Sequence, residues 1–433
     1  MKSSMDKEVQ PASVLRGSPS LPADKSISHR SVIFASLHQG HSTITNFSTA
    51  ADPHSTICCM RSLGVNIQEK DHSIKVEGVG RDGLKSPDED LDCGNSGTTM
   101  RLLSGIIAGA GTTAQLIGDK SLSSRTMQRI IDPLTDMGAQ IDARDGDFAP
   151  LHIQRNGKLQ PLHFPLPIPS AQLKSCVLLA GLFGDDPTTV IETLPSRDHT
   201  ERLLQLDIQE QKDKKIIHSS RADNIPAQSY RIPNDFSAAS FWLVAGAVHP
   251  EAKISMKAVG MNPTRNAALE ILKNMNAEIT VSDRRKEGAE PVADITVSSS
   301  QLQPVDITKE MVPNCIDEIP ILAVAMLFAD GTSKITGAEE LRHKETDRLA
   351  ALSDILKKAG ASFMEFEDGI EIHGNPDFTP QQGSFSSEHD HRIAMSAAVL
   401  SLMGEQPSQI SNAACTDISY PNFWDDLQLL TNW

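Results

Sequence analysis

The sequence predicts an α/β protein built from six copies of one folding unit. Short stretches with the apolar–polar alternation of strands are interleaved with longer apolar stretches that suit helices. The helices of one apolar, small-residue-rich type begin with residues able to cap a helix, at Ser28, Thr98, Ser170, Ser237, Asp317 and Asp390. Near-equal intervals of about 70 residues between these starts indicate an internal repeat.

The ends of a second helix type support the same repeat. The segments SLGVNIQ, DMGAQIDA, NMNAEITV and KAGASFMEF place Gly64, Gly138, Asn276 and Gly360 where a helix would stop. Glycine and asparagine tolerate the left-handed backbone that ends many helices, and the residues that follow alternate as in a strand. The predicted unit is therefore β-α-β-α-β-β, with one buried helix and one outer amphipathic helix.

Two arrangements of the six units are compatible with this pattern. One is a continuous solenoid. The other, which we favour, is two globular domains of three units each, because the turn-rich segment RIPNDFSAAS separates the third unit from the fourth. This segment places the boundary between the two domains around Pro233 to Ser237.

The composition excludes several classes of protein. The 433 residues carry 56 acidic and 40 basic side chains, a net charge of −16, which argues against a broad basic surface for nucleic acid. Small anions remain possible ligands if positive charge is concentrated locally. The six cysteines form no CxxC pair and are expected to be reduced. Because the first residues lack the apolar core of a secretory signal and no apolar run could cross a bilayer, we expect a cytoplasmic protein.

The helix starts are candidate anion sites. Free N–H groups and the helix dipole favour negative charge there. Basic residues stand beside four of the predicted starts: Lys25, His29 and Arg30 at the first, Arg101 at the second, Lys174 at the third and Arg392 at the sixth. Six such helices aimed at one cleft would form a pocket for phosphate or carboxylate.

Four motifs add polar side chains to these starts. LPADKSISHR joins Lys25 and Arg30 to the hydroxyls of Ser26 and Ser28, a set suited to phosphate, although a capped helix with surface charge would look the same. CGNSGTTMR is a glycine-rich turn but not a Walker loop, so ATP and GTP are not expected.

RTMQR is predicted to place Arg125 and Arg129 on one helix face, a pattern also typical of a solvated face. PLPIPSAQLKS uses prolines to hold an extended lead-in before Ser170, Ala171 and Gln172.

Two acidic groups are the candidates for proton transfer. Asp317 begins a very apolar helix, where it either caps the helix or faces a cleft. The segment ELRHKETDRLAAL supplies Lys344, Glu345 and Arg348, with Lys344 and Arg348 expected one helical turn apart. An ion-pair lattice is the alternative, but a carboxylate among substrate-binding cations can relay a proton. HDHR, which ends at Arg392, lacks a third ligand of suitable spacing, so no metal site is predicted.

Taken together, LPADKSISHR, GNSGTTMR, PSAQLKS, SRDHTE, DEIPILAVA, RHKETDR and DHRIAMS resemble, in this order, the 5-enolpyruvylshikimate-3-phosphate synthase family, and SRDHTE and MNPTR resemble its class II branch. The resemblance implies an inverted α/β barrel, two similar domains each of three β-α-β-α-β-β units. One domain would hold residues 21–235 and the other residues 1–20 together with 236–433, with the active site in the cleft between them. It also implies transfer of the enolpyruvyl group of phosphoenolpyruvate to the 5-hydroxyl of shikimate 3-phosphate, with release of phosphate. That reaction belongs to chorismate and aromatic amino-acid biosynthesis, needs no metal or organic cofactor, and is the target of glyphosate.

The resemblance also assigns site residues. Catalysis would involve Asp317 as the base for the 5-hydroxyl, Glu345 as the acid for the methylene carbon, and Lys25. Shikimate 3-phosphate would be bound by Lys25, Ser26, Arg30, Ser170, Ala171, Gln172, Arg197, Asp317 and Lys344. Phosphoenolpyruvate would be bound by Lys25, Gly97, Arg125, Gln172, Arg348 and Arg392. A monomer whose domains close over these ligands is expected.

The chain departs from the family pattern at three points. Ala23 stands where glycine is usual, Thr126 replaces the usual proline of the RPMxR motif, and ACTDISYPNF lacks the late lysine of class I. Two rival interpretations remain. The related UDP-N-acetylglucosamine enolpyruvyl transferases carry Lys-Asn where this chain has Lys25-Ser26, and SAQ and KETDR argue against them. The other rival is a non-catalytic anion-binding protein of this fold. The presence of both Asp317 and Glu345, which such a protein could lose, argues against it.

Overall fold

The computed structural model describes residues 6–70 and 72–431, which form a mixed α/β fold divided into two compact units. Unit 1 comprises the chain up to Pro22, Pro233–Arg285 and the chain from Pro291 onward, and unit 2 comprises Ala23–Ile232 and Lys286–Glu290. Each unit has its own apolar core. Among the described residues, no helix has the length and apolar character needed to span a membrane.

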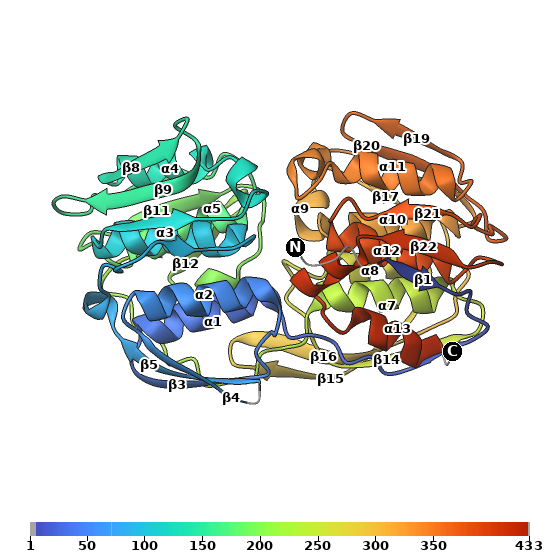
Figure 1. Cartoon of the computed structure of the whole chain (residues 1–433), viewed down its shortest axis with the longest axis horizontal. Helices are drawn as coiled ribbons and strands as arrows, with labels where there is room; N and C mark the ends of the chain where they lie inside the picture. Colours follow the sequence, from blue (N-terminus) through green and yellow to red (C-terminus); the bar gives the residue numbers. More distant parts are fainter. Residues whose placement is uncertain (1–5, 71, 432–433) are drawn as a thin grey trace. The chain divides into compact units, whose positions relative to one another are not determined.

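Among its described residues, unit 2 contains three sheets and six α-helices (Figure 1). In spatial order the sheets are β3 (Gln39–Thr45), β5 (Ser73–Val79) and β4 (Asn66–Lys70); β6 (Leu91–Asp92), β7 (Ala114–Ile117), β9 (Phe148–Arg155) and β8 (Ala139–Arg144); and β10 (His163–Pro165), β11 (Thr188–Glu192), β13 (Lys214–Ser219) and β12 (Ile208–Gln211). The helices are α1 (Lys25–Leu37), α2 (Ala51–Ser62), α3 (Gly97–Ala110), α4 (Gln128–Asp136), α5 (Ala171–Gly181) and α6 (His199–Leu204).

Unit 1 contains three further sheets and seven α-helices among its described residues. Its sheets are β15 (Glu278–Glu287), β16 (Glu290–Ser298), β14 (Ala252–Gly260) and β2 (Leu15–Gly17); β17 (Asp306–Ile307), β18 (Gly331–Ile335), β20 (Gly369–Gly374) and β19 (Phe363–Phe366); and β1 (Lys7–Val9), β22 (Ser408–Ser411) and β21 (Ser384–Ser386). Its helices are α7 (Phe236–Val248), α8 (Ala267–Asn274), α9 (Val312–Cys315), α10 (Ile319–Leu327), α11 (Arg348–Lys358), α12 (His391–Ser401) and α13 (Phe423–Thr431).

The sheets repeat one pattern of strand pairing. In the four-stranded sheets an edge strand pairs in parallel with its neighbour, as β6 does with β7, β10 with β11, β17 with β18 and β2 with β14. The other pairs in these sheets are antiparallel. In the β3–β5–β4 sheet, a parallel bridge from Thr45 to Arg231 takes the corresponding place. This recurrence is consistent with the repeated unit that the sequence predicts.

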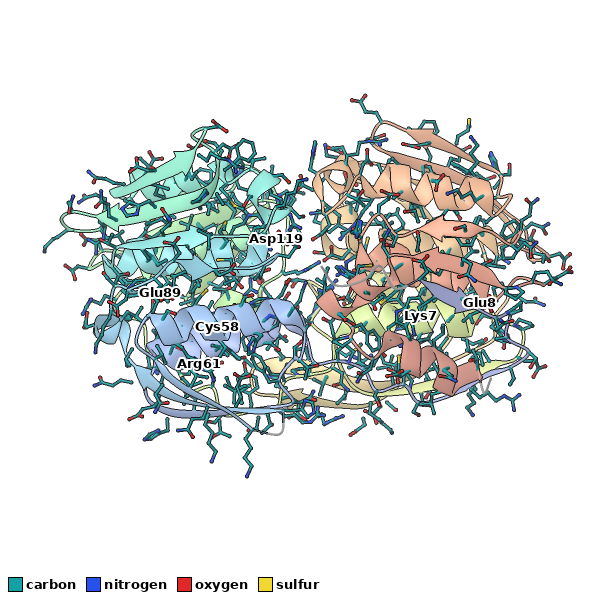
Figure 2. The ribbon with its side chains drawn as sticks, in the orientation of Figure 1. Lys7, Glu8, Cys58, Arg61, Glu89 and Asp119 are labelled. Atoms are coloured by element: carbon teal, nitrogen blue, oxygen red, sulfur yellow. The ribbon has the colours of Figure 1, made fainter. Side chains whose placement is uncertain are left out.

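The two helix types differ in burial as predicted. Along α3, α7 and α12 almost every residue is buried, whereas α2 has one covered face and one open face. Thr56 and Met60 of α2 face the core, while Cys58 and Arg61 lie on its outer side (Figure 2). Such one-sided burial is typical of an outer amphipathic helix.

The predicted helix ends are confirmed. Gly64, Gly138, Asn276 and Gly360 follow α2, α4, α8 and α11 with φ of 96°, 96°, 68° and 78°. A strand follows each of them, as expected. The left-handed backbone explains why glycine or asparagine stands at these positions.

The predicted helix starts are only partly right. Ser170 and Asp390 are the residues that cap α5 and α12. Ser28, Thr98 and Ser237 instead lie inside their helices, because capping side chains occur two to four residues earlier, at Asp24, Ser96 and Asp235. Asp317 does not cap α10, since that helix starts after Glu318 without a side-chain cap.

Candidate active site

The start of α1 presents Lys25, Ser26 and Arg30 in unit 2. Lys25 Nζ lies 3.1 Å from a carboxylate oxygen of Asp52, and both side chains are mostly buried. Arg30 is only 3% exposed. Its guanidinium donates to Thr200 Oγ1 at 2.7 Å, to Ser175 Oγ at 2.9 Å and to the carbonyl of Ser26 at 3.1 Å. These three partners are uncharged, so they orient the cation without neutralising it.

Burial shifts the pKa of two groups on this helix. It lowers the pKa of Arg30 to about 10, against the opposing attraction of Glu201 and Asp24. Burial and the charges of Lys25 and Arg30 also hold the pKa of His29 well below its usual value. The imidazole is therefore neutral at pH 7, and Nδ1 lies 2.7 Å from Thr56 Oγ1 in a chain that continues to Thr99 at 2.8 Å.

Helices α3 and α5 meet at a second group of predicted residues. Gln172 donates to Thr98 Oγ1 at 3.0 Å and accepts from Arg101 Nη1 at 2.6 Å. A methyl group added at Gly97 would come within 2.9 Å of Arg101 Nη1 and 3.6 Å of Arg125 Nη1. The absence of a side chain at Gly97 thus leaves room for two guanidinium groups beside a helix start.

Ser170 and Ala171 stand at the start of the same helix. Ser170 Oγ accepts from the amide of Leu173 at 3.4 Å, and Ala171 is the first residue of α5. The proline-rich lead-in includes Pro165, the last residue of β10, which pairs with β11 at an edge of its sheet. An edge strand is where proline is tolerated, so the extended approach to Ser170 is confirmed in part.

Arg125 occupies a different local structure from the one predicted. It follows a short 3-10 turn at Leu122–Ser124, and α4 begins only at Gln128. Arg125 and Arg129 therefore do not share a helix face. Arg125 Nη2 donates to Asn95 Oδ1 at 3.0 Å and to Ser121 Oγ at 3.3 Å, which turns it toward the glycine-rich segment before α3.

Arg197 precedes α6 in a segment fixed by a buried charge network. Lys174, which is fully buried, lies 3.0 Å from Glu192 and 2.7 Å from Glu201. Burial alone would lower the pKa of Lys174, but the two carboxylates raise it. Glu192 also accepts from the amide of Ser196 at 2.8 Å. The charge of Arg197 contributes to the lowered pKa of Arg30, so the two cations are close enough to repel each other.

In unit 1, Asp317 lies between two arginines. Arg348 Nη1 is 3.2 Å from Asp317 Oδ1, and Arg392 Nη2 is 3.5 Å from Asp317 Oδ2. Arg392 Nη1 also donates to the Asp317 carbonyl at 3.0 Å. Asp317 therefore does not cap the helix, as one of the two predictions had it. Its carboxylate is paired with two arginines instead.

Arg348 joins the same group to Glu345. Its Nη2 is 2.5 Å from Glu345 Oε2, and its Nε is 2.7 Å from the fully buried Asp390. Burial would lower the pKa of Arg348, but the surrounding carboxylates raise it above its usual value. Lys344 is nearby and its pKa is lowered by burial, with Asp317 opposing the shift. Lys344 precedes α11, which begins at Arg348, so the predicted shared helix face is wrong.

The site residues therefore fall into two groups, each within one unit. In unit 2, Lys25 pairs with Asp52, and Arg30 donates to Thr200 at the start of α6. Gly97, Arg125 and Gln172 lie around Arg101. In unit 1, Asp317, Glu345, Arg348 and Arg392 form one ion-pair cluster. Clustered cations and carboxylates of this kind suit anionic substrates and proton transfer.

A family model described as EPSP synthase (3-phosphoshikimate 1-carboxyvinyltransferase) matches residues 9–427. This chain is a member of the EPSP synthase family. Its activity is accordingly that of a 3-phosphoshikimate 1-carboxyvinyltransferase of the shikimate pathway. The resemblance stated from the motifs is thereby confirmed.

Relatives named 3-phosphoshikimate 1-carboxyvinyltransferase match almost the whole chain. The 3-phosphoshikimate 1-carboxyvinyltransferase of Salinibacter ruber is 49% identical over 98% of this chain and 99% of its own length. That of Parasynechococcus marenigrum is 46% identical over 98% and 97%. The solved EPSP synthase of Acinetobacter baumannii superposes with a TM-score of 0.88 at 37% identity, covering 98% of both chains. The enolpyruvyl transferase NikO of Streptomyces tendae, at 16% identity and a TM-score of 0.75, shares the fold alone.

The buried residues that pair next to the unit 1 cluster were not predicted from the sequence. Arg265, 4% exposed, binds both oxygens of the fully buried Glu318 at 2.9 and 2.8 Å. Ser237 Oγ donates to the same carboxylate and accepts from Arg392 Nη1. Arg265 ends the MNPTR motif and Glu318 follows Asp317 in DEIP. The charge in each motif is visible in the sequence, but its burial, which makes a partner necessary, is not.

Proposed function

We propose that this EPSP synthase works by addition and elimination, with the residue roles that the family resemblance assigns. Asp317 would take the proton of the 5-hydroxyl while the hydroxyl oxygen adds to the central carbon of phosphoenolpyruvate. Glu345 would protonate the methylene carbon, giving a tetrahedral intermediate with a new methyl group. Departure of phosphate and loss of a proton from that methyl group would restore the double bond.

The unit 2 group would bind shikimate 3-phosphate. Lys25, Ser26, Arg30 and Arg197 supply cations and a hydroxyl, and Ser170, Ala171 and Gln172 supply polar groups at the start of α5. The argument rests on Arg30, whose charge is held by neutral oxygens and is therefore available to an incoming anion. Gly97 and Arg125 would hold phosphoenolpyruvate together with Lys25 and Gln172.

The unit 1 group would bind the other side of phosphoenolpyruvate and carry the proton transfers. Arg348 and Arg392 are paired with Asp317 and, for Arg348, with Glu345. An anionic substrate that takes over these guanidinium groups would release both carboxylates next to the reacting carbon. Binding and activation of the acid and base would then be one event. Lys344, with its lowered pKa, would contact the shikimate 3-phosphate.

Both groups are needed for one reaction, so we propose that the two units act as domains that close over the substrates. We further propose that each half is an inverted α/β barrel domain of three units, and that the protein acts as a monomer in the cytoplasm. The six free cysteines fit a reducing compartment. Small-angle scattering should show compaction when shikimate 3-phosphate and an inhibitor are added together, and an unchanged profile would contradict closure.

Phosphate release tests the proposed function. Release should require shikimate 3-phosphate and phosphoenolpyruvate together and should persist in excess chelator. UDP-N-acetylglucosamine in place of shikimate 3-phosphate should support none, which separates this proposal from the related transferase. Release with phosphoenolpyruvate alone, or loss of release in chelator, would contradict it.

A further inference from the structure

A small piece of unit 2 comes from a distant part of the sequence. Residues 286–290 belong to unit 2, yet they form the tip of the hairpin β15–β16, whose strands otherwise belong to unit 1. The chain thus returns to unit 2 after leaving it at Ile232. Among the residues of this tip, Glu290 is buried, with 1% of its surface exposed.

The tip is tightly packed within unit 2. Glu290 Oε1 lies 2.8 Å from His199 Nδ1, and Glu290 Oε2 lies 3.9 Å from Arg202 Nε. Gly288 has φ +57°, and a methyl group added there would come within 2.9 Å of the Tyr230 ring. Ala289 packs against the apolar core of the unit. A buried carboxylate is stable only when it is paired, so these contacts fix both the tip and its partners.

The partners of Glu290 belong to the first turns of α6, beside two of the proposed substrate cations. His199 and Thr200 begin the helix, directly after Arg197 and Asp198. Thr200 Oγ1 accepts from Arg30 Nε at 2.7 Å. Arg202 holds Asp198 through two hydrogen bonds, at 3.1 and 2.5 Å. A shift of His199 or Arg202 would therefore move the neighbours of both Arg197 and Arg30.

We propose that Glu290 is a positioning residue for shikimate 3-phosphate, acting through His199 and Arg202 on the segment that carries Arg197. It would not touch the substrate. This inference rests on the proposed function, because it takes Arg197 and Arg30 as the ligands of that substrate. It adds that the binding segment of unit 2 depends on a residue about 90 positions further along the chain, supplied by a hairpin.

The test compares substrate affinities of matched variants. Glu290→Gln keeps the shape of the side chain and removes its charge, and Glu278→Gln does the same at an exposed position of the same hairpin. Calorimetry should give a dissociation constant for shikimate 3-phosphate about tenfold weaker in Glu290→Gln and unchanged in Glu278→Gln. The KM for phosphoenolpyruvate and kcat at saturation should stay within about twofold of the parent.

A second pair of variants tests the route through His199. His199→Asn keeps a donor near the position of Nδ1 and should retain affinity, whereas His199→Ala should weaken shikimate 3-phosphate as Glu290→Gln does. If Glu290→Gln fails to fold, the affinities of His199→Asn and His199→Ala for shikimate 3-phosphate test the proposal on their own. Unchanged affinity in Glu290→Gln and His199→Ala, or equal weakening of both substrates, would overturn the proposal. A parent protein that does not bind shikimate 3-phosphate at all would instead overturn the proposed function.

Discussion

Two buried arginines, Arg30 in unit 2 and Arg348 in unit 1, have opposite surroundings. Both are nearly inaccessible to solvent, at 3% and 2% exposure. The hydrogen bonds of Arg30 end on two hydroxyls and a carbonyl, and burial lowers its pKa to about 10. Those of Arg348 end on three carboxylates, which raise its pKa. Glu201 and Asp24 thus attract Arg30 without a hydrogen bond among the described residues, whereas Arg348 is bonded directly to three carboxylates.

We propose that the two arginines serve different steps, with Arg30 in substrate binding and Arg348 in the reaction. A cation oriented by neutral oxygens gains most from an incoming phosphate or carboxylate, which suits the capture of shikimate 3-phosphate. In the proposed mechanism, Arg348 exchanges its carboxylates for the substrate, and two of those carboxylates are the proposed base and acid, Asp317 and Glu345. Lys25, which pairs with Asp52, is an intermediate case in unit 2. We therefore expect changes in unit 2 to act mainly on affinity and changes in the unit 1 carboxylates to act on turnover.

The largest effect is expected for the unit 1 carboxylates. Asp317→Asn and Glu345→Gln should each lower kcat by about a thousandfold or more, because each removes a proposed proton-transfer group. The dissociation constant for shikimate 3-phosphate, measured by calorimetry, should change by less than about threefold.

Glu339→Gln, at an exposed position just before the same segment, is the matched control and should leave kcat unchanged. Near-normal turnover of either site variant would remove its assigned role. Loss of shikimate 3-phosphate affinity equal to the loss of turnover would erase the contrast between the two units.

A smaller effect is expected for Arg125→Lys in unit 2. The planar guanidinium that donates to Asn95 and Ser121 can also grip an anion with two donors, and a lysine cannot do both. The KM for phosphoenolpyruvate should rise about tenfold, and the KM for shikimate 3-phosphate should rise less. Arg129→Lys, at the second residue of α4, serves as the control. Equal increases for the two substrates would show that Arg125 does not discriminate between them.

The sequence predicted local features of this fold better than long-range ones. Gly64 and Asn276 end helices as expected, because a left-handed residue is a property of the local backbone. The partners of Asp317 were not predictable in the same way, since Arg348 and Arg392 come from separate helices later in the chain.

Short turns caused the clearest local errors. The 3-10 segments Leu122–Ser124 and Glu339–His343 displace Arg125 and Lys344 from the helices to which a 3.6-residue period assigned them. The candidate site residues were assigned from the family resemblance of the motifs, several of which also place cations beside helix starts. Their supporting partners, such as Glu290 and Arg265, carry no periodic signal and become visible only when burial and pairing are known.

A measurement of stability tests the chain of neutral hydrogen-bonded groups that runs from His29 through Thr56 to Thr99 inside unit 2. The folded protein keeps His29 neutral because its pKa is lowered, so the unfolded chain binds the extra proton first as pH falls. Stability should therefore decrease below about pH 6.5, with a slope of at most about 1.4 kcal/mol per pH unit from this group.

His29→Asn should flatten that slope between pH 7.5 and 5.5 in denaturant titrations, whereas His41→Asn, at an exposed position, should not. An identical slope in parent and His29→Asn protein would show that this imidazole does not set the acid sensitivity of unit 2.

The smallest effect is expected for Gly97→Ala. The added methyl group meets the tip of the flexible Arg101 side chain at 2.9 Å, so the guanidinium must move by a small amount. The KM for phosphoenolpyruvate should rise about threefold, and shikimate 3-phosphate should be almost unaffected. Gly260→Ala, where the nearest atom would be 3.4 Å away, is the control. A larger rise in the KM for shikimate 3-phosphate than in the KM for phosphoenolpyruvate would contradict the assignment of Gly97 to the phosphoenolpyruvate site.

The central claim is that substrate anions replace the catalytic carboxylates on the unit 1 arginines. A crystal structure with shikimate 3-phosphate and a non-reacting analogue of phosphoenolpyruvate tests it most directly. Arg348 should bind the analogue, its distance to Asp317 should increase from 3.2 Å to more than about 4 Å, and Asp317 should accept from the 5-hydroxyl. An occupied site in which Arg348 and Asp317 remain paired and Asp317 makes no contact with that hydroxyl would contradict the account.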